Sequence, residues 1–178
     1  PELHARRGAA RGGTADVGRA MIMGAFSTKA DKALSLYGYK GSEGPPDDPI
    51  LGNVPTQFVT DLIFRCPSNQ MASFQQAAGQ KVWRYQFGLP VPESGRPVEH
   101  SAELKYVFDA PPAGATFASW PPVQVYWTNF AKTGSPNGPG LPKWPSMGKQ
   151  ATYMSFTPQG PKLGKDLRGP ICRLMATP

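Results

Sequence analysis

Histidine, the side chain best suited to proton transfer at neutral pH, occurs only at His4 and His100 in the 178 residues. His100 follows the segment 81–87 by one loop, and the alternating aromatic residues of that segment predict a strand. Catalytic groups of open α/β sheets gather on loops beyond the carboxyl ends of strands. His100 is therefore a candidate general base; the alternative is a loop histidine that only packs or forms a hydrogen bond. His4 lies in a basic terminal segment, and we predict no role for it.

The other residues that could take part in chemistry are two cysteines, Cys66 and Cys172. A metal site needs three or four ligands, and the sequence contains no second cluster of suitable residues. We therefore predict neither a metal nor another cofactor. By themselves the two cysteines fit either a disulfide or a pair of buried free thiols.

The charge and composition of the chain exclude several functional classes. The formal charge is +7, but four arginines fall in the first twenty residues and the other basic residues are scattered. Without a basic run interleaved with aromatic residues, we predict no nucleic-acid binding. No apolar run reaches the ~18 residues that a membrane span needs, and no signal peptide is visible. The 20 glycines and 21 prolines exclude helical bundles, coiled coils and solenoids.

The periodicity of the chain predicts a loop-rich α/β fold with an incomplete sheet. We expect residues 1–22 to be a poorly ordered basic segment and residues 23–178 to form the folded part. The chain starts at Pro1, from which we expect a fragment or a processed product. Apolar spacing predicts helices near residues 30–37, 54–64, 68–78 and 123–132, with Pro67 breaking the second, and a short strand over residues 153–156.

Four ordered motifs resemble type-B carboxylesterases, the family that includes the cholinesterases. They are Asp61-Leu-Ile-Phe64-Arg-Cys66-Pro67, Val82-Trp-Arg-Tyr85-Gln-Phe87, His100-Ser-Ala-Glu103-Leu104, and Trp127-Thr-Asn-Phe130-Ala-Lys-Thr-Gly134 followed by Trp144-Pro145. The helix ending in Leu36-Tyr37 also matches. The resemblance covers roughly residues 25–175 and implies the C-terminal portion of an α/β-hydrolase fold.

The resemblance implies a role for His100 as the catalytic histidine of a Ser-His-Glu/Asp triad. Glu103 matches the carboxylate that ties the histidine loop down; the alternative is a surface carboxylate. Ser101 replaces the small residue, often glycine, that follows the histidine. Glu2 precedes His100 by 98 residues, a separation that the family allows for the triad acid. Its neighbour Leu3 departs from the family's Glu-Gly, so Glu2 is either the triad acid or an unrelated carboxylate.

The chain contains no G-x-S-x-G nucleophile elbow, and the oxyanion-hole glycines, which lie upstream in the family, are also absent. We expect the chain alone to be inactive and to need a serine-bearing N-terminal portion in order to hydrolyse a small carboxylic ester. The alternative is a non-catalytic, cholinesterase-like fragment that serves folding or partner binding.

The positions of Cys66 and Cys172 match a disulfide of the family. A disulfide indicates a secreted, periplasmic or other extracytoplasmic protein, whereas free thiols would indicate the cytoplasm. Among the tryptophans, the helical spacing places Trp127 on a core face, and Trp120, in a loop, is the better candidate for a pocket wall.

Overall fold

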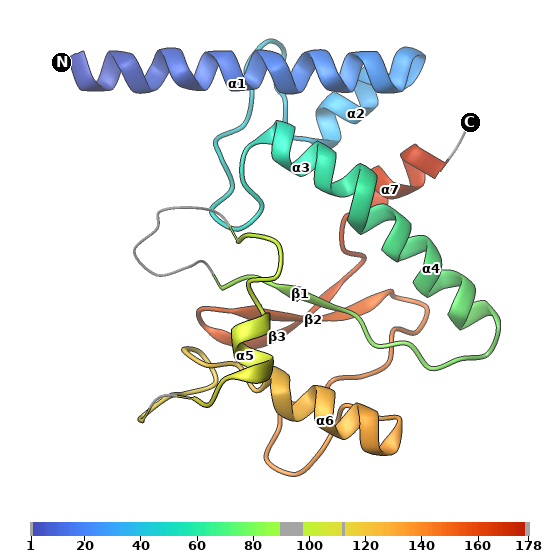
Figure 1. Ribbon diagram of the computed structural model, residues 1–178. Coiled ribbons are helices and arrows are strands. Elements are labelled where there is room, and N and C mark those ends of the chain that lie inside the picture. The colour runs from blue at the N-terminus through green and yellow to red at the C-terminus, as the bar shows by residue number, and fades with distance from the viewer. Residues whose placement is uncertain (1, 90–97, 112, 177–178) are drawn as a thin grey trace. The chain divides into compact units, whose positions relative to one another are not determined.

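The computed structural model describes residues 2–89, 98–111 and 113–176, with side chains from residue 13 onward. The chain divides into two compact units. Unit 1 comprises Pro1–Met71 together with Arg168–Pro178, and unit 2 comprises Ala72–Leu167. Figure 1 shows the elements of both units along the chain. No helix in the described part of the chain is long and apolar enough to cross a membrane.

Unit 1 consists of helices around one apolar core. Its elements are α1 (Glu2–Phe26), the short 3₁₀ turn η1 (Ser27–Lys29), α2 (Ala30–Leu36), α3 (Val54–Thr60), the π turn η2 (Asp61–Arg65), the start of α4 (Cys66–Ala77), and α7 (Gly169–Ala176). The core joins residues from both ends of the chain, among them Ile22, Phe26, Leu34, Phe58, Ile171 and Leu174.

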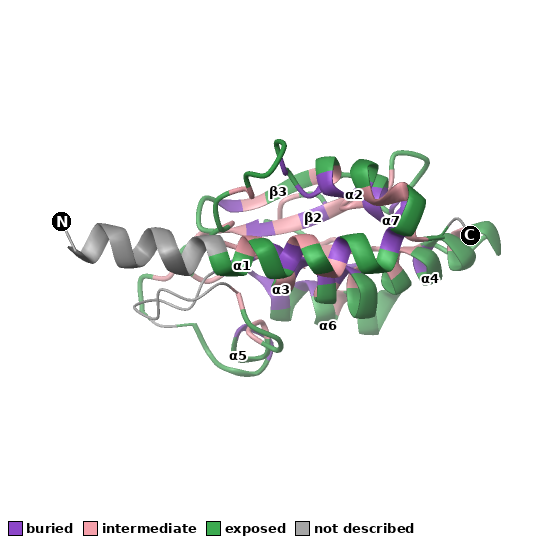
Figure 2. Cartoon of the chain, turned by 90° about the horizontal axis from the view of Figure 1, so that it is seen from above, coloured by how far each residue is buried: buried purple, intermediate pink, exposed green. Residues whose placement is uncertain are grey.

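Helix α1 occupies the segment for which the sequence predicts little order. Its second half carries Gly18, Ile22 and Phe26 at four-residue intervals, which places them on one face. Ile22 is fully buried and Phe26 is 8% exposed, and Figure 2 shows buried positions recurring along the helix. A Cβ atom at Gly18 would lie 2.7 Å from the Tyr39 hydroxyl, so glycine permits this close approach. Tertiary packing therefore stabilises a helix that cannot be predicted from the polar composition of the segment.

The prediction that Pro67 ends a helix is wrong. Helix α3 continues through the π turn η2 into α4 without a break, and the Cys66 amide donates to the Asp61 carbonyl, five residues back. The wider π turn makes room at the point where a proline ring would clash with the preceding turn of an α-helix. Met71 and Phe74 of α4 are 66% and 65% exposed.

A buried carboxylate, Asp61, organises unit 1. Its side chain is fully buried, and Arg168 donates to Oδ2 through Nε at 2.8 Å. The Tyr37 hydroxyl also donates to Oδ2, at 3.0 Å, and Arg65 Nη1 donates to Oδ1 at 3.0 Å. Burial, together with the Asp61 charge, raises the pKa of Tyr37 well above its usual range, so Tyr37 remains a neutral donor. The π turn is thereby joined to the residue that immediately precedes α7.

A disulfide between Cys66 and Cys172 lies beside this ionic cluster. The two Cα atoms are 5.0 Å apart and the bridge closes a separation of 106 residues. The structure thus contains the pairing that the resemblance implies. Cross-linking a loop of this length lowers the entropy of the unfolded chain, which stabilises the folded state by up to about 4–5 kcal/mol.

Unit 2 contains a three-stranded sheet of β1 (Tyr85–Phe87), β2 (Thr152–Thr157) and β3 (Gly160–Lys165) in the order β1-β2-β3. Strand β1 pairs parallel with β2, and β2 pairs antiparallel with β3. The predicted α/β class with an incomplete sheet is confirmed, although β1 is shorter than predicted and β3 was not predicted. Among the described strands, β1 has a partner on one edge only.

Two helices, α5 (Leu104–Phe108) and α6 (Val123–Thr133), cover one face of this sheet (Figure 1). The register pairs Tyr85 with Met154 and Phe87 with Phe156, so these four side chains share that face. They form a core with buried residues of the helices, which are Tyr106, Val107, Val123 and Tyr126. The predicted helix over residues 123–132 is present as α6.

Replacing the buried carboxylate tests its role in unit 1. Asp61→Asn keeps the size of the side chain but leaves Arg168 and Arg65 without a charged partner, so we expect a loss of about 3 kcal/mol in the free energy of unfolding. Urea denaturation of the oxidised protein measures it. Asp31→Asn, at an exposed position in α2, is the control. Equal, small losses for the two variants would show that the buried cluster does not stabilise the unit.

Candidate functional site

His100 lies in a turn over residues 100–103, immediately before α5. The turn is held by its own backbone, because the Leu104 amide donates to the Ser101 carbonyl at 3.1 Å and the Tyr106 amide to the Glu103 carbonyl at 2.9 Å. The His100 side chain is exposed. An imidazole on a fixed turn can accept a proton from a group that approaches from outside unit 2.

Ser101 adopts a left-handed backbone conformation, with φ of +66°. Residues with a Cβ rarely adopt this conformation, and glycine adopts it without strain. The turn geometry therefore gives a physical reason for the small residue that the resemblance places after the histidine. Serine fills the position at a modest conformational cost.

Glu103 connects the histidine turn to the sheet. It is half-buried and occupies the N-cap position of α5. Its carboxylate accepts a hydrogen bond from the Tyr85 hydroxyl of β1; burial, reinforced by this contact and the Glu103 charge, raises the pKa of Tyr85 to about 12. Tyr85 is thus a neutral donor at pH 7, and the turn is tied to a strand 18 residues earlier in the chain.

Helix α5 gives the turn a rigid base. Tyr106 and Val107 are buried, and the Tyr106 ring lies 5.1 Å from the ring of Phe87. Gln124 of α6 donates to the Val107 carbonyl at 2.7 Å. The chain leaves β1 at Phe87, where the Gly88 amide still bonds to the Phe156 carbonyl. His100 follows β1 in the chain, as the sequence predicts.

The other predicted members of the site are less fully described. Glu2 is the first residue of α1, and its side chain lies outside the described side chains, so its pairing with His100 stays a prediction. Sequence reasoning missed Tyr85 as the partner of Glu103. The only signal was a tyrosine in the predicted strand before the histidine loop, and nothing in the spacing indicated which carboxylate it meets.

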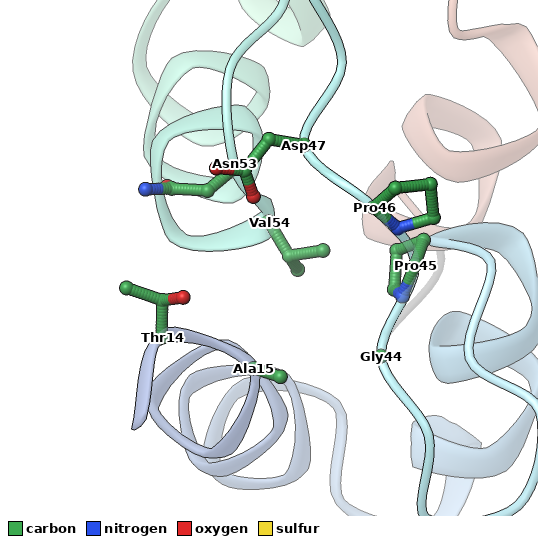
Figure 3. Close-up of a pocket in the computed structure, with 8 residues that line it drawn as sticks. All are labelled: Thr14, Ala15, Gly44, Pro45, Pro46, Asp47, Asn53 and Val54. Carbon is green, nitrogen blue, oxygen red and sulfur yellow. The ribbon is translucent and has the colours of Figure 1, made fainter. Parts of the chain in front are cut away.

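A pocket of about 270 Å³ in unit 1 (Figure 3) contains none of the predicted site residues. Small side chains and prolines supply most of its wall, and its polar side chains are Thr14, Asp47 and Asn53. The side-chain oxygen of Asn53 already accepts a hydrogen bond from the Thr56 amide at 3.0 Å. The residues that line the pocket include no serine, cysteine or histidine.

Comparison with known proteins accounts for the four motifs. The sequence model of the carboxylesterase family matches residues 32–175. The chain belongs to the carboxylesterase family. This confirms the resemblance to type-B carboxylesterases.

Two mammalian carboxylesterases illustrate how far the similarity extends. Liver carboxylesterase 1 of Oryctolagus cuniculus is 32% identical over 125 residues, which cover 64% of this chain and 22% of the rabbit protein. Carboxylesterase 4A of Bos taurus is 28% identical over 139 residues, 72% of this chain and 25% of the bovine protein. The chain therefore spans about a quarter or less of these relatives.

A solved structure shows that the fold is shared more widely. An esterase from Clostridium hathewayi that can hydrolyze aliphatic aromatic polyesters superposes with a TM-score of 0.55 at 19% identity. The match covers 88% of this chain and 31% of the bacterial one. At this identity the likeness establishes the fold alone.

Removing the Tyr85 hydroxyl tests the tie to the histidine turn. Tyr85→Phe leaves the Glu103 carboxylate without this donor. We therefore expect the free energy of unfolding at pH 7 to fall by about 1–2 kcal/mol, and amide hydrogen exchange over residues 99–108 to become faster. Because folding raises the pKa of Tyr85 from 10.0 to about 12, its stabilising effect is complete below pH 10 and is lost as the pH rises to 12.

The variant should therefore lose less stability than the parent between pH 10 and pH 12. Tyr153→Phe, which removes a hydroxyl from β2, is the control. Unchanged exchange of the turn amides in Tyr85→Phe would contradict the tie.

Proposed function

We propose that this chain supplies the general-base histidine of a serine carboxylic-ester hydrolase, and that His100 is that residue. The observation that carries the proposal is the turn of residues 100–103, which follows β1 and is tied back to it by the Glu103–Tyr85 hydrogen bond. The turn lies inside the segment that matches the carboxylesterase family. An exposed imidazole on an anchored turn is the geometry that a general base needs.

In the proposed reaction His100 transfers one proton in each of two half-reactions. It accepts the proton of a serine hydroxyl as the serine oxygen attacks the ester carbonyl, and it returns that proton to the departing alcohol. It then takes a proton from the water that attacks the acyl-enzyme and returns it to the serine when the carboxylic acid leaves. Glu103 acts as a positioning residue, because it holds the turn without reaching the reacting atoms.

The proposal requires a second set of residues. These 178 residues contain no G-x-S-x-G elbow, so a serine-bearing portion N-terminal to this chain supplies the nucleophile and the oxyanion hole. Glu2 is a candidate for the triad acid, which would fix the tautomer of His100 and stabilise the imidazolium. A small ester is the substrate class that the family supports.

The disulfide supports an extracytoplasmic location for this activity. Cys66 and Cys172 are joined, and disulfides persist in oxidising compartments such as the periplasm or the extracellular space.

A second proposal, a non-catalytic fragment that binds a partner, has one observation in its favour. Apolar side chains of unit 1 along η2 and the start of α4 are 52–66% exposed, namely Leu62, Ile63, Phe64 and Met71. Such a surface fits association as well as membership of a larger enzyme.

A complementation assay separates the two functions. The chain alone should hydrolyse p-nitrophenyl acetate no faster than free imidazole does, because it lacks the nucleophile and the oxyanion hole. Addition of a serine-bearing N-terminal portion should restore turnover that a serine-directed organophosphate abolishes. His100→Ala should then lower kcat by about a thousandfold or more.

His4→Ala is the matched control and should leave kcat unchanged. Saturable, organophosphate-sensitive turnover by the chain alone would overturn the need for a partner portion. Full activity of the complemented His100→Ala protein would overturn the role of His100 and favour the second proposal.

A further inference from the structure

The loop after α6 contains the dipeptide Asn137-Gly138, which is the only Asn-Gly pair in the 178 residues. Glycine has no side chain, so its backbone nitrogen can approach the side-chain carbon of a preceding asparagine more freely than that of any other residue. Attack by this nitrogen expels the side-chain nitrogen as ammonia, which is one reason why asparagine is a thermolabile residue. Both residues of the pair are half-buried in unit 2, so the surrounding loop can control this reaction.

Both polar atoms of the Asn137 side-chain amide are hydrogen-bonded to the backbone of one residue. Oδ1 accepts from the Trp144 amide at 2.7 Å, and Nδ2 donates to the Trp144 carbonyl at 2.8 Å. Ring closure onto the Gly138 nitrogen makes the side-chain carbon tetrahedral and turns it toward the backbone, so the planar pair of hydrogen bonds has to break first. The native loop therefore raises the barrier to the reaction.

The backbone on either side of the pair is also fixed. Asn129 Nδ2 donates to the Pro136 carbonyl at 3.2 Å, and the Leu141 amide donates to the Gly138 carbonyl at 3.3 Å. A Cβ atom at position 138 would lie 2.6 Å from Asn129 Nδ2, so a larger residue here would displace that side chain. The fold thus requires the glycine that makes the preceding asparagine reactive.

Trp144, the partner of Asn137, belongs to the core of unit 2. It is 3% exposed, and its ring lies 5.3 Å from that of Tyr126 and 6.0 Å from that of Phe156. Its carbonyl also accepts from Trp83 Nε1 at 3.1 Å. An aspartate at position 137 has no N–H and would place a carboxylate oxygen against this carbonyl, and an isoaspartate would also lengthen the backbone by one atom. Either product would therefore disturb the packing of a core side chain.

We propose that Asn137 is a modification site, at which local opening of unit 2 leads to irreversible deamidation that the native loop suppresses. In the opened loop the Gly138 nitrogen bonds to Cγ of Asn137, the Cγ–Nδ2 bond breaks, and the proton of the Gly138 nitrogen passes through solvent to the departing ammonia. Water then opens the succinimide ring at either carbonyl, which gives aspartate or isoaspartate. The sum of the steps is uptake of one water and release of one ammonia, without oxidation or reduction. The product cannot donate to the Trp144 carbonyl, so an opened molecule does not regain the native packing.

Mass spectrometry of the 178-residue chain at mildly alkaline pH tests the proposal, because deamidation replaces an NH₂ group by OH and peptide mapping locates the change. In guanidinium chloride Asn137 should deamidate before the other asparagines, which precede larger residues and are Asn53, Asn69 and Asn129. In the native protein the reaction at Asn137 should be at least about tenfold slower, because it follows the small open population of the loop. Equal rates with and without denaturant would overturn the protection.

A variant with a weakened loop separates local opening from global unfolding. Trp83→Phe removes the second donor to the Trp144 carbonyl, so native deamidation of Asn137 should become about threefold to tenfold faster, while the rate in guanidinium chloride stays unchanged. The expectation that Trp127 lies on the core face of α6 is wrong, since Trp127 is 40% exposed. Trp127→Phe is therefore the matched control and should leave the native rate unchanged. Equal native rates in the two variants would overturn the role of the Trp144 contacts.

The effect of the product on the fold can be measured directly. Asn137→Asp should speed amide hydrogen exchange over residues 137–147 by about tenfold relative to the parent chain. Asn53→Asp, at the N-cap of α3, is the control and should leave this exchange unchanged, because an aspartate oxygen still accepts from the Thr56 amide. Unchanged exchange in Asn137→Asp would overturn the claim that deamidation prevents the return to native packing.

Discussion

The buried Asp61 carboxylate is the interaction on which the arrangement of the chain depends. It accepts hydrogen bonds from Arg65 of its own π turn and from Arg168, 107 residues later. The Cys66–Cys172 disulfide closes almost the same interval. Together they secure both ends of the segment that forms unit 2. They also bring the eight-residue helix α7, too short to persist alone in water, into the core of unit 1, where Ile171 and Leu174 are buried.

Local pattern predicted the elements whose stability is local, and missed those held by distant contacts. The spacing of Val123 and Tyr126, with Gly134 at the end, identified α6. The amphipathic periodicity of a helix depends only on residues that are close in the sequence. Strand β3 escaped prediction because its sequence, Gly-Pro-Lys-Leu-Gly-Lys, disfavours strands and is held by pairing with β2. The continuous helix through Pro67 likewise depends on a π turn, and the helical state of α1 depends on tertiary packing. Neither can be recognised from a local sequence pattern.

The candidate site shows the same division between local and long-range information. The family motif identified His100, Glu103 and the small residue at Ser101, and the positive φ of Ser101 explains that last preference. The partner of Glu103 could not be predicted, because Tyr85 reaches it through the tertiary fold. Tyr85 also lines a pocket of unit 2 together with Trp127 and Trp144. One side chain thus anchors the histidine turn with its hydroxyl and forms part of a separate surface with its ring.

The central claim is that His100 is the base of an ester-hydrolysing serine. A crystal structure of this chain together with its serine-bearing portion, inhibited by an organophosphonate, tests it most directly, because the phosphonyl group marks the nucleophile. We predict that a His100 ring nitrogen lies within about 3.2 Å of the oxygen of the marked serine or of the phosphonyl group. A different histidine at that position, with His100 still facing solvent, would contradict the account.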